Sequence, residues 1–109
     1  MFKIVIYSLV FSLNSFSQTN NKLDSVSTMS LVFMGDIMGH DSQIYAAKDS
    51  LGKYDYNSVF KKVSHIIQGA SFAIANLEVT LAGAPYQGYP RFSSPDALAI
   101  ACKNSGIDV

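Results

Sequence analysis

The chain reads Ser-Leu-Val-Phe-Met-Gly-Asp over residues 30–36. Its apolar run, Leu-Val-Phe-Met, ends abruptly in Gly35 and Asp36. An uninterrupted apolar run that stops at turn residues is typical of a strand buried on both faces in a parallel sheet. We therefore predict the first strand here, in a domain that begins near Met29.

A helix and a second strand follow. From Asn57 onward, apolar residues recur at helical spacing and Gly69 stands where the helix should stop; they are Val59, Phe60, Val63, Ile66 and Ile67. Ser-Phe-Ala-Ile-Ala at 71–75 then predicts a second buried strand, which runs into Asn-Leu-Glu at 76–78. Strand, helix and strand in one sheet imply a right-handed parallel crossover, so the carboxyl ends of both strands share one edge.

Residues 82–94 combine chain-breaking residues with aromatic ones. The segment contains Gly83, Pro85, Gly88, Pro90, Tyr86, Tyr89 and Phe92. So many breakers exclude a regular element, and so many aromatic side chains are unusual for a simple linker. We predict an ordered surface loop.

Ser94 followed by Pro95 predicts a helix N-cap and a first-turn proline. The helix should run from Ala97 to about Asn104 and close at Gly106, after which residues 107–109 resemble the start of a third parallel strand. The predicted class is therefore α/β, a β-α-β-α-β portion of a domain over residues 29–109. Because such a strand needs partners on both sides, we expect the chain to be truncated.

The first seventeen residues have the layout of a signal peptide. Lys3 provides a positive start, residues 4–13 are mostly apolar, and small residues at 15 and 17 suit cleavage before Gln18. The apolar segment is shorter than the ~20 residues that span a bilayer, so no stable transmembrane span is expected. The alternative is a buried N-terminal strand. Export would place the protein in the periplasm, in the cell envelope or outside the cell, with residues 18–28 as a flexible spacer.

The overall composition is that of a globular domain. Eight basic and eight acidic residues balance among 109, and 49% of the chain is hydrophobic. This argues against disorder and against a nucleic-acid-binding tail. The single cysteine, Cys102, excludes an intrachain disulfide, and its apolar neighbours favour a buried structural role.

Three polar side chains follow the two predicted strands. Asp36 comes at the end of the first, and Asn76 and Glu78 come at the end of the second, two residues apart and so on one face. Adjacent strands lie ~4.8 Å apart, so these groups can converge into a site for a hard metal ion. The alternatives are an Asx-turn or helix cap for Asp36, a turn bridge for Asn76 and a solvated carboxylate for Glu78.

Two further residues have side chains suited to chemistry. His40 is a candidate metal ligand or general acid, and otherwise a loop histidine before a helix capped by Asp41 or Ser42. Arg91 could pair with an anionic substrate group, or be a solvated loop arginine.

Taken in order, Leu-Val-Phe-Met-Gly-Asp-Ile-Met (31–38), Ala-Asn-Leu-Glu (75–78) and Phe-Ser-Ser-Pro with the following helix and Gly-Ile-Asp-Val (92–109) resemble the CapA family. That family is named for poly-γ-glutamate capsule synthesis. Its domain is similar to the calcineurin-like metallophosphoesterases, a β-sandwich flanked by helices. The resemblance covers roughly residues 29–109.

The resemblance implies specific roles for residues of this chain. Asp36 would be a metal ligand, with Asn76 and Glu78 lining the same site, for a divalent cation such as Mn, Fe or Zn. It also implies an Asn-Asn-His motif and further site residues beyond Val109, so this chain would hold only part of the site. It assigns no role to His40, which stays a candidate catalytic residue.

Two functions follow as hypotheses. The first is an exported CapA-like, metallophosphatase-like protein of capsule or envelope polymer synthesis, acting on an anionic polymer or a phosphate-containing substrate, with this chain inactive by itself. The second is a non-catalytic protein that binds or scaffolds the polymer through the loop at 82–94, with Tyr89 and Arg91 as contacts.

Overall fold

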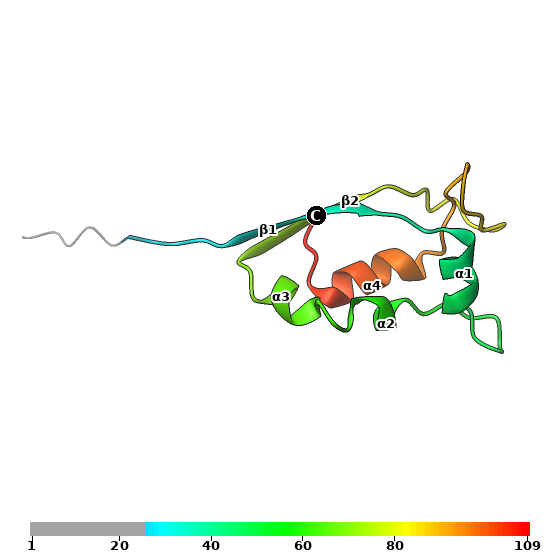
Figure 1. Cartoon of the computed structure of the whole chain (residues 1–109), viewed down its shortest axis with the longest axis horizontal. Helices are drawn as coiled ribbons and strands as arrows, with labels where there is room; N and C mark the ends of the chain where they lie inside the picture. Colours follow the sequence, from blue (N-terminus) through cyan, green and yellow to red (C-terminus); the bar gives the residue numbers. More distant parts are fainter. Residues whose placement is uncertain (1–25) are drawn as a thin grey trace, which may run out of the picture.

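A computed structural model describes residues 26–109, in which two strands and four helices form a mixed α/β arrangement (Figure 1). In chain order these are β1 (Leu31–Ile37), α1 (Asp41–Ala47), α2 (Asn57–Phe60), α3 (Ser64–Gln68), β2 (Phe72–Leu77) and α4 (Ala97–Ser105). The predicted α/β class is confirmed. None of the helices in this part of the chain is long and apolar enough to cross a membrane. The predicted signal peptide at 1–17 and most of the spacer, residues 18–25, lie outside the described residues.

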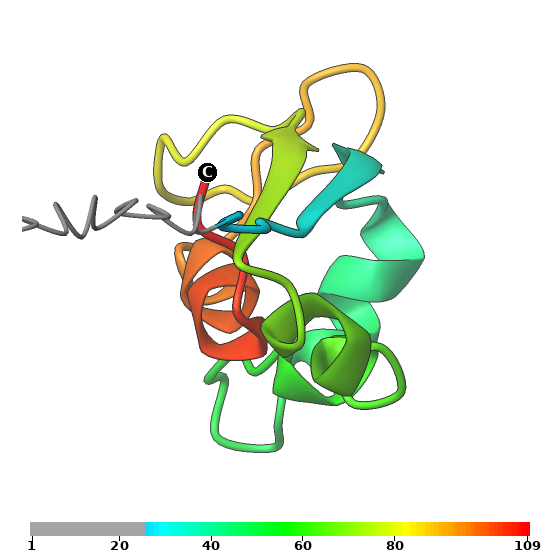
Figure 2. The same ribbon diagram turned by 90° about the vertical axis from the view of Figure 1, so that its left-hand side faces the viewer.

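β1 and β2 pair in parallel, as the strand–helix–strand order predicts. Leu31 lies opposite Phe72 and Phe33 opposite Ile74, and the register then shifts so that Asp36 faces Asn76. Figure 2 shows the helices gathered on one side of the two strands. Side chains alternate along a strand, so one face of the sheet packs on the helices and the other faces away from them.

The expectation that both strands are buried on two faces is wrong. The sheet face turned away from the helices, called the outer face below, carries Leu31, Phe33, Phe72 and Ile74, and Phe33 is 70% exposed. Ala73, on the opposite face, is 1% exposed. The sequence pattern correctly indicated that the two strands are apolar. Among residues 26–109, however, helices cover only one face of the sheet.

Residues 107–109 run beside β2 on the edge opposite β1. The amide of Asp108 donates to the Ala73 carbonyl at 2.9 Å, and the amide of Ala75 donates to the Val109 carbonyl at 2.7 Å. No regular strand is assigned to these three residues, yet they take the position that the predicted third strand would take.

The single helix predicted from Asn57 is instead two short helices, α2 and α3, separated by a turn at 61–63. In that turn the amide of Val63 donates to the Phe60 carbonyl, three residues back, at 2.9 Å. This tighter winding changes which residues face inward. Ile67 is buried, whereas Val59, Val63 and Ile66 are exposed although they belong to the predicted apolar stripe.

The core lies beneath the sheet, between α2 and α4. Tyr56, Leu98 and Ala101 are buried together, and half-buried side chains pack against them, namely Ile37, Ala47, Tyr54, Phe60, Val79 and Ala97. Cys102 is buried as expected, and burial raises the pKa of its thiol, which makes it a poor nucleophile.

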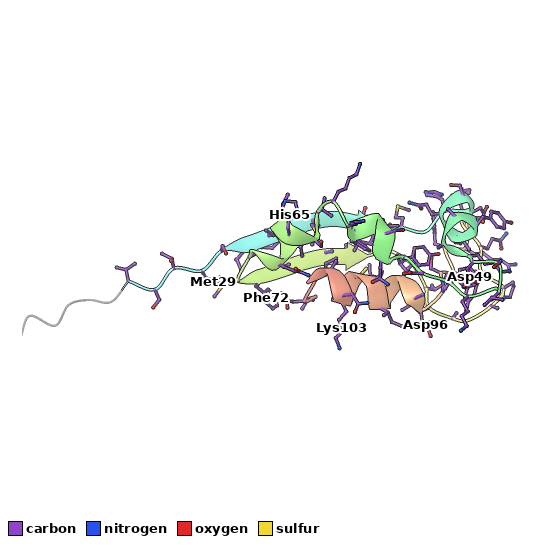
Figure 3. All side chains as sticks on the ribbon, turned by 90° about the horizontal axis from the view of Figure 1, so that it is seen from below. Met29, Asp49, His65, Phe72, Asp96 and Lys103 are labelled. Carbon is purple, nitrogen blue, oxygen red and sulfur yellow. The ribbon has the colours of Figure 1, made fainter. Side chains whose placement is uncertain are left out.

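The helix predicted from Ala97 is confirmed as α4, and it ends as predicted at Gly106 with a left-handed φ of 100°. The predicted cap is wrong: Asp96, and not Ser94, precedes the first helical residue. In Figure 3, Asp96 lies at the start of α4 and Lys103 near its end. This order of charges favours the helix dipole. Ser94 is instead fully buried.

Candidate functional site

Asp36, Asn76 and Glu78 come together at the carboxyl ends of the two strands and are named the carboxylate corner here. Asp36 lies opposite Asn76, whose Nδ2 donates a hydrogen bond to Asp36 Oδ1 at 2.8 Å. The amide of Glu78 donates to the Ile37 carbonyl at 3.1 Å, which continues the pairing one residue past β2. The sequence-based expectation that the three side chains converge therefore agrees with the geometry.

An irregularity in β1 produces this alignment. With the register of Phe33 and Ile74 continued unchanged, Asp36 would lie opposite Leu77. The shift between Phe33 and Asp36 moves Asp36 by one position and places it opposite Asn76. Gly35 lies within the shifted segment, and glycine inside a strand is the sequence signal for such a bulge. The sequence predicts the end of the strand at Gly35, whereas β1 continues to Ile37.

The two carboxylates of the corner influence each other. The hydrogen bond from Asn76, and then the contact with Glu78, lower the pKa of Asp36 below its ordinary value. Hydrogen bonding with Asp36, and then its negative charge, raise the pKa of Glu78. As the pH falls, one of two such neighbouring carboxyl groups takes up a proton, which removes the repulsion between their negative charges. A bound cation would relieve the same repulsion.

The donor set fits a divalent cation in part. Two carboxylates and one amide provide hard oxygen ligands, whereas hard divalent ions take about six or more. The corner is exposed, and Asn76 and Glu78 alternate with Leu77 so that they share the outer face with Phe72 and Ile74. Residues 26–109 hold no cluster of three His, Cys, Asp or Glu side chains.

His40 is part of a different surface. It precedes α1 as the capping residue, where Asp41 or Ser42 was expected, and its amide donates to Gln43 Oε1 at 2.8 Å. Its ring packs edge-on against Phe92, with centroids 5.3 Å apart. His40 makes no hydrogen bond to Asp36 or Glu78 in the described part of the chain, so its contacts tie it to the loop at 82–94.

That loop, named the aromatic loop here, is ordered and docks on the start of α1. The amide of Gly88 donates to Asp41 Oδ1 at 2.6 Å. A β-carbon on Gly88 would lie only 2.7 Å from the Asp41 nitrogen, so glycine is required by the close approach. The sequence indicates Asp41 only as a helix cap, and no pattern in it predicts this contact.

The predicted substrate contacts are on the exposed side of the aromatic loop. Tyr89 is 75% exposed, and its ring packs edge-on against Phe92 with centroids 6.0 Å apart. Arg91 is exposed as well. Phe92 links the two sides of the surface because its ring contacts both His40 and Tyr89. The structure thus brings His40, Tyr89 and Phe92 together, separately from the carboxylate corner.

The comparison with known families agrees with this arrangement of motifs. A family model for the bacterial capsule synthesis protein PGA_cap matches residues 30–109, which include both strands, the aromatic loop and α4. The chain therefore belongs to this family of bacterial capsule synthesis proteins, as the resemblance to the CapA family implied. No curated protein and no solved structure matches the chain.

Proposed function

We propose that this member of the capsule synthesis family is an exported protein that acts on an envelope polymer of the poly-γ-glutamate type, with a divalent cation held in part by the carboxylate corner. Family membership supports the role in capsule synthesis. The observation that carries the metal site is the contact of Asp36 with Asn76 and Glu78 at adjoining strand ends.

Each residue of the corner has a separate task in this proposal. Asp36 is the anionic ligand, and its low pKa keeps it ionised. Asn76 orients the Asp36 carboxylate through its amide nitrogen, which leaves its own oxygen as a donor. Glu78 supplies the second carboxylate. A cation bound there would supply Lewis-acid chemistry, by polarising a phosphoryl or carbonyl oxygen and activating a water molecule. Oxygen donors favour hard ions, so Mn²⁺ is the first of Mn, Fe and Zn to test.

The aromatic loop provides the contacts with the anionic polymer or phosphate-containing substrate. The Arg91 guanidinium pairs with carboxylate or phosphate oxygens. Tyr89 offers an exposed ring beside it. His40, which packs on the same loop through Phe92, is the candidate general acid for a substrate that extends from the carboxylate corner to this loop. Export rests on the signal-peptide layout of residues 1–17, and the test is whether mass spectrometry of the protein recovered from the envelope finds Gln18 as its first residue.

Calorimetric titration with Mn²⁺ tests the metal site. Asp36→Ala and Glu78→Ala should each weaken binding by roughly tenfold or more, because each removes a charged ligand. Asp96→Ala is the matched control, since Asp96 is exposed and its side chain caps nothing. Equal Mn²⁺ affinity in all four proteins would show that the corner holds no cation.

A second function, non-catalytic polymer binding, is favoured by the order and exposure of the aromatic loop. Under this hypothesis Tyr89→Ala and Arg91→Ala lose affinity for poly-γ-glutamate in a pull-down, and a chelator has no effect. Chelator-sensitive binding that survives both substitutions would favour the metal site instead.

A further inference from the structure

Ser94 is buried without a partner for its hydroxyl. The residue is 0% exposed, and Ser94 Oγ has no hydrogen-bond partner in residues 26–109. A buried polar group of this kind is unusual in folded proteins and calls for an explanation. Its neighbour Ser93 differs, because Ser93 Oγ donates to the Gly83 carbonyl at 3.2 Å.

The hydroxyl of Ser94 packs directly against Gly39, which follows β1. A β-carbon added to Gly39 would collide with Ser94 Oγ, whereas the next nearest atoms, Ser94 Cβ and Leu98 Cδ2, would be at 3.5 and 3.8 Å. Gly39 does not have a left-handed φ. Glycine is therefore needed at this position for space and not for backbone conformation.

The backbone of Ser94 contacts the segment that follows β2. Its amide donates to the Thr80 carbonyl at 2.9 Å. Thr80 lies two residues after Glu78, and Gly39 lies three residues after Asp36. Ser94 thus contacts both segments that follow the carboxylate corner, one through Gly39 and the other through Thr80.

We propose that Ser94 is a positioning residue that sets the separation of the two strand ends bearing Asp36 and Glu78, through its side chain on Gly39 and its amide on Thr80. The inference rests on the proposed function only in taking that corner as the metal site. It assigns to Ser94 a contribution to cation affinity without contact with the cation.

The test is a size exchange across the Ser94–Gly39 contact. Gly39→Ala adds a methyl group that must push Ser94 away, and Ser94→Ala removes the atom in its path. The double variant should fit because the remaining contacts are of ordinary van der Waals length. Ser93→Ala combined with Gly39→Ala is the matched control, since the Ser93 hydroxyl bonds Gly83 and its removal should rescue nothing.

Two readouts are used on the full chain. The side-chain amide signals of Asn76 in ¹⁵N NMR spectra report its hydrogen bond to Asp36 without any cation, and calorimetry reports Mn²⁺ affinity. Gly39→Ala should shift the Asn76 signals and weaken Mn²⁺ binding by about tenfold, as loss of a supporting contact does at metal sites. The Gly39→Ala/Ser94→Ala variant should restore both readouts, and the Ser93 control should restore neither.

Unchanged Asn76 signals in Gly39→Ala, or a double variant that fails to restore them, would overturn the proposal. If Gly39→Ala yields no folded protein, the double variant decides: it should fold with wild-type Asn76 signals, and an unfolded double variant also overturns the proposal. Failure of the proposed function gives a different result. In that case the Asn76 signals shift in Gly39→Ala and return in the Gly39→Ala/Ser94→Ala variant, but the wild-type chain binds no Mn²⁺.

Discussion

The two acids of the carboxylate corner, at the scale of single residues, respond to their polar neighbours more than to burial. Both are exposed; the hydrogen bond from Asn76, and then the contact with Glu78, lower the pKa of Asp36, whereas hydrogen bonding with Asp36, and then its charge, raise the pKa of Glu78. Glu78 is therefore the group that gains a proton first as the pH falls. The protonation state of Glu78 should control whether the corner is charged enough to attract a cation.

Cation binding should weaken as the pH falls through the raised pKa of Glu78. The bound state needs Glu78 ionised, so affinity is fully present above this pKa and is lost below it. Glu78→Gln should bind Mn²⁺ more weakly at pH 7, with a flatter pH dependence. Titrations with Mn²⁺ between pH 7 and pH 4 measure both. A wild-type affinity that stays constant over this range would contradict the role of Glu78.

Phe92 combines a strained backbone conformation with side-chain packing in the aromatic loop. Its φ of 45° is left-handed, a conformation that costs a residue with a side chain about 1 kcal/mol or more. Phe92→Ala keeps that strain and loses the contacts with His40 and Tyr89, whereas Phe92→Gly loses the contacts and relieves the strain. The glycine variant should therefore melt roughly 4–8 °C above the alanine variant. Equal melting temperatures would show that position 92 is not strained.

At the scale of elements, the C-terminal ends of helices were more predictable than their N-terminal caps or their continuity. Gly106 indicated the end of α4 because a glycine after an amphipathic stretch favours a left-handed cap. The break between α2 and α3 had no comparable signal, since Lys61, Lys62 and Val63 are all compatible with a helix. The break follows from packing: α2 and α3 both contact α4, and a tighter turn at 61–63 lets each do so.

Gly106→Ala should destabilise the fold by about 1–2 kcal/mol, the cost of a left-handed φ for alanine. The added β-carbon would also lie 2.7 Å from Gln68 Cγ on α3, so both helices are affected. Urea unfolding monitored by circular dichroism measures the change. Gly35→Ala is the control, because nothing lies within 4 Å of a β-carbon there and its φ is not left-handed. A smaller loss for Gly106→Ala than for Gly35→Ala would contradict the capping role.

At the scale of the whole molecule, the sequence predicted the α/β class, the parallel pairing and the convergence of the corner. Each depends on local patterns: an apolar run, a helical repeat and polar residues at strand ends. Three other features depend on contacts between segments distant in the chain. They are the register shift at Gly35, the docking of Gly88 on Asp41 and the packing of Ser94 against Gly39. No periodicity in the sequence encodes such contacts, so they became visible only in the structure.

The most direct test of the central claim is where Mn²⁺ binds on the chain. Paramagnetic Mn²⁺ added in small amounts broadens the NMR signals of the nuclei nearest to it. We predict that the side-chain amide of Asn76 and the backbone amides of Asp36 and Glu78 broaden first, and that Mg²⁺ in excess restores them. Early broadening at His40 and Arg91, with the corner signals intact, would contradict the account and place the cation elsewhere.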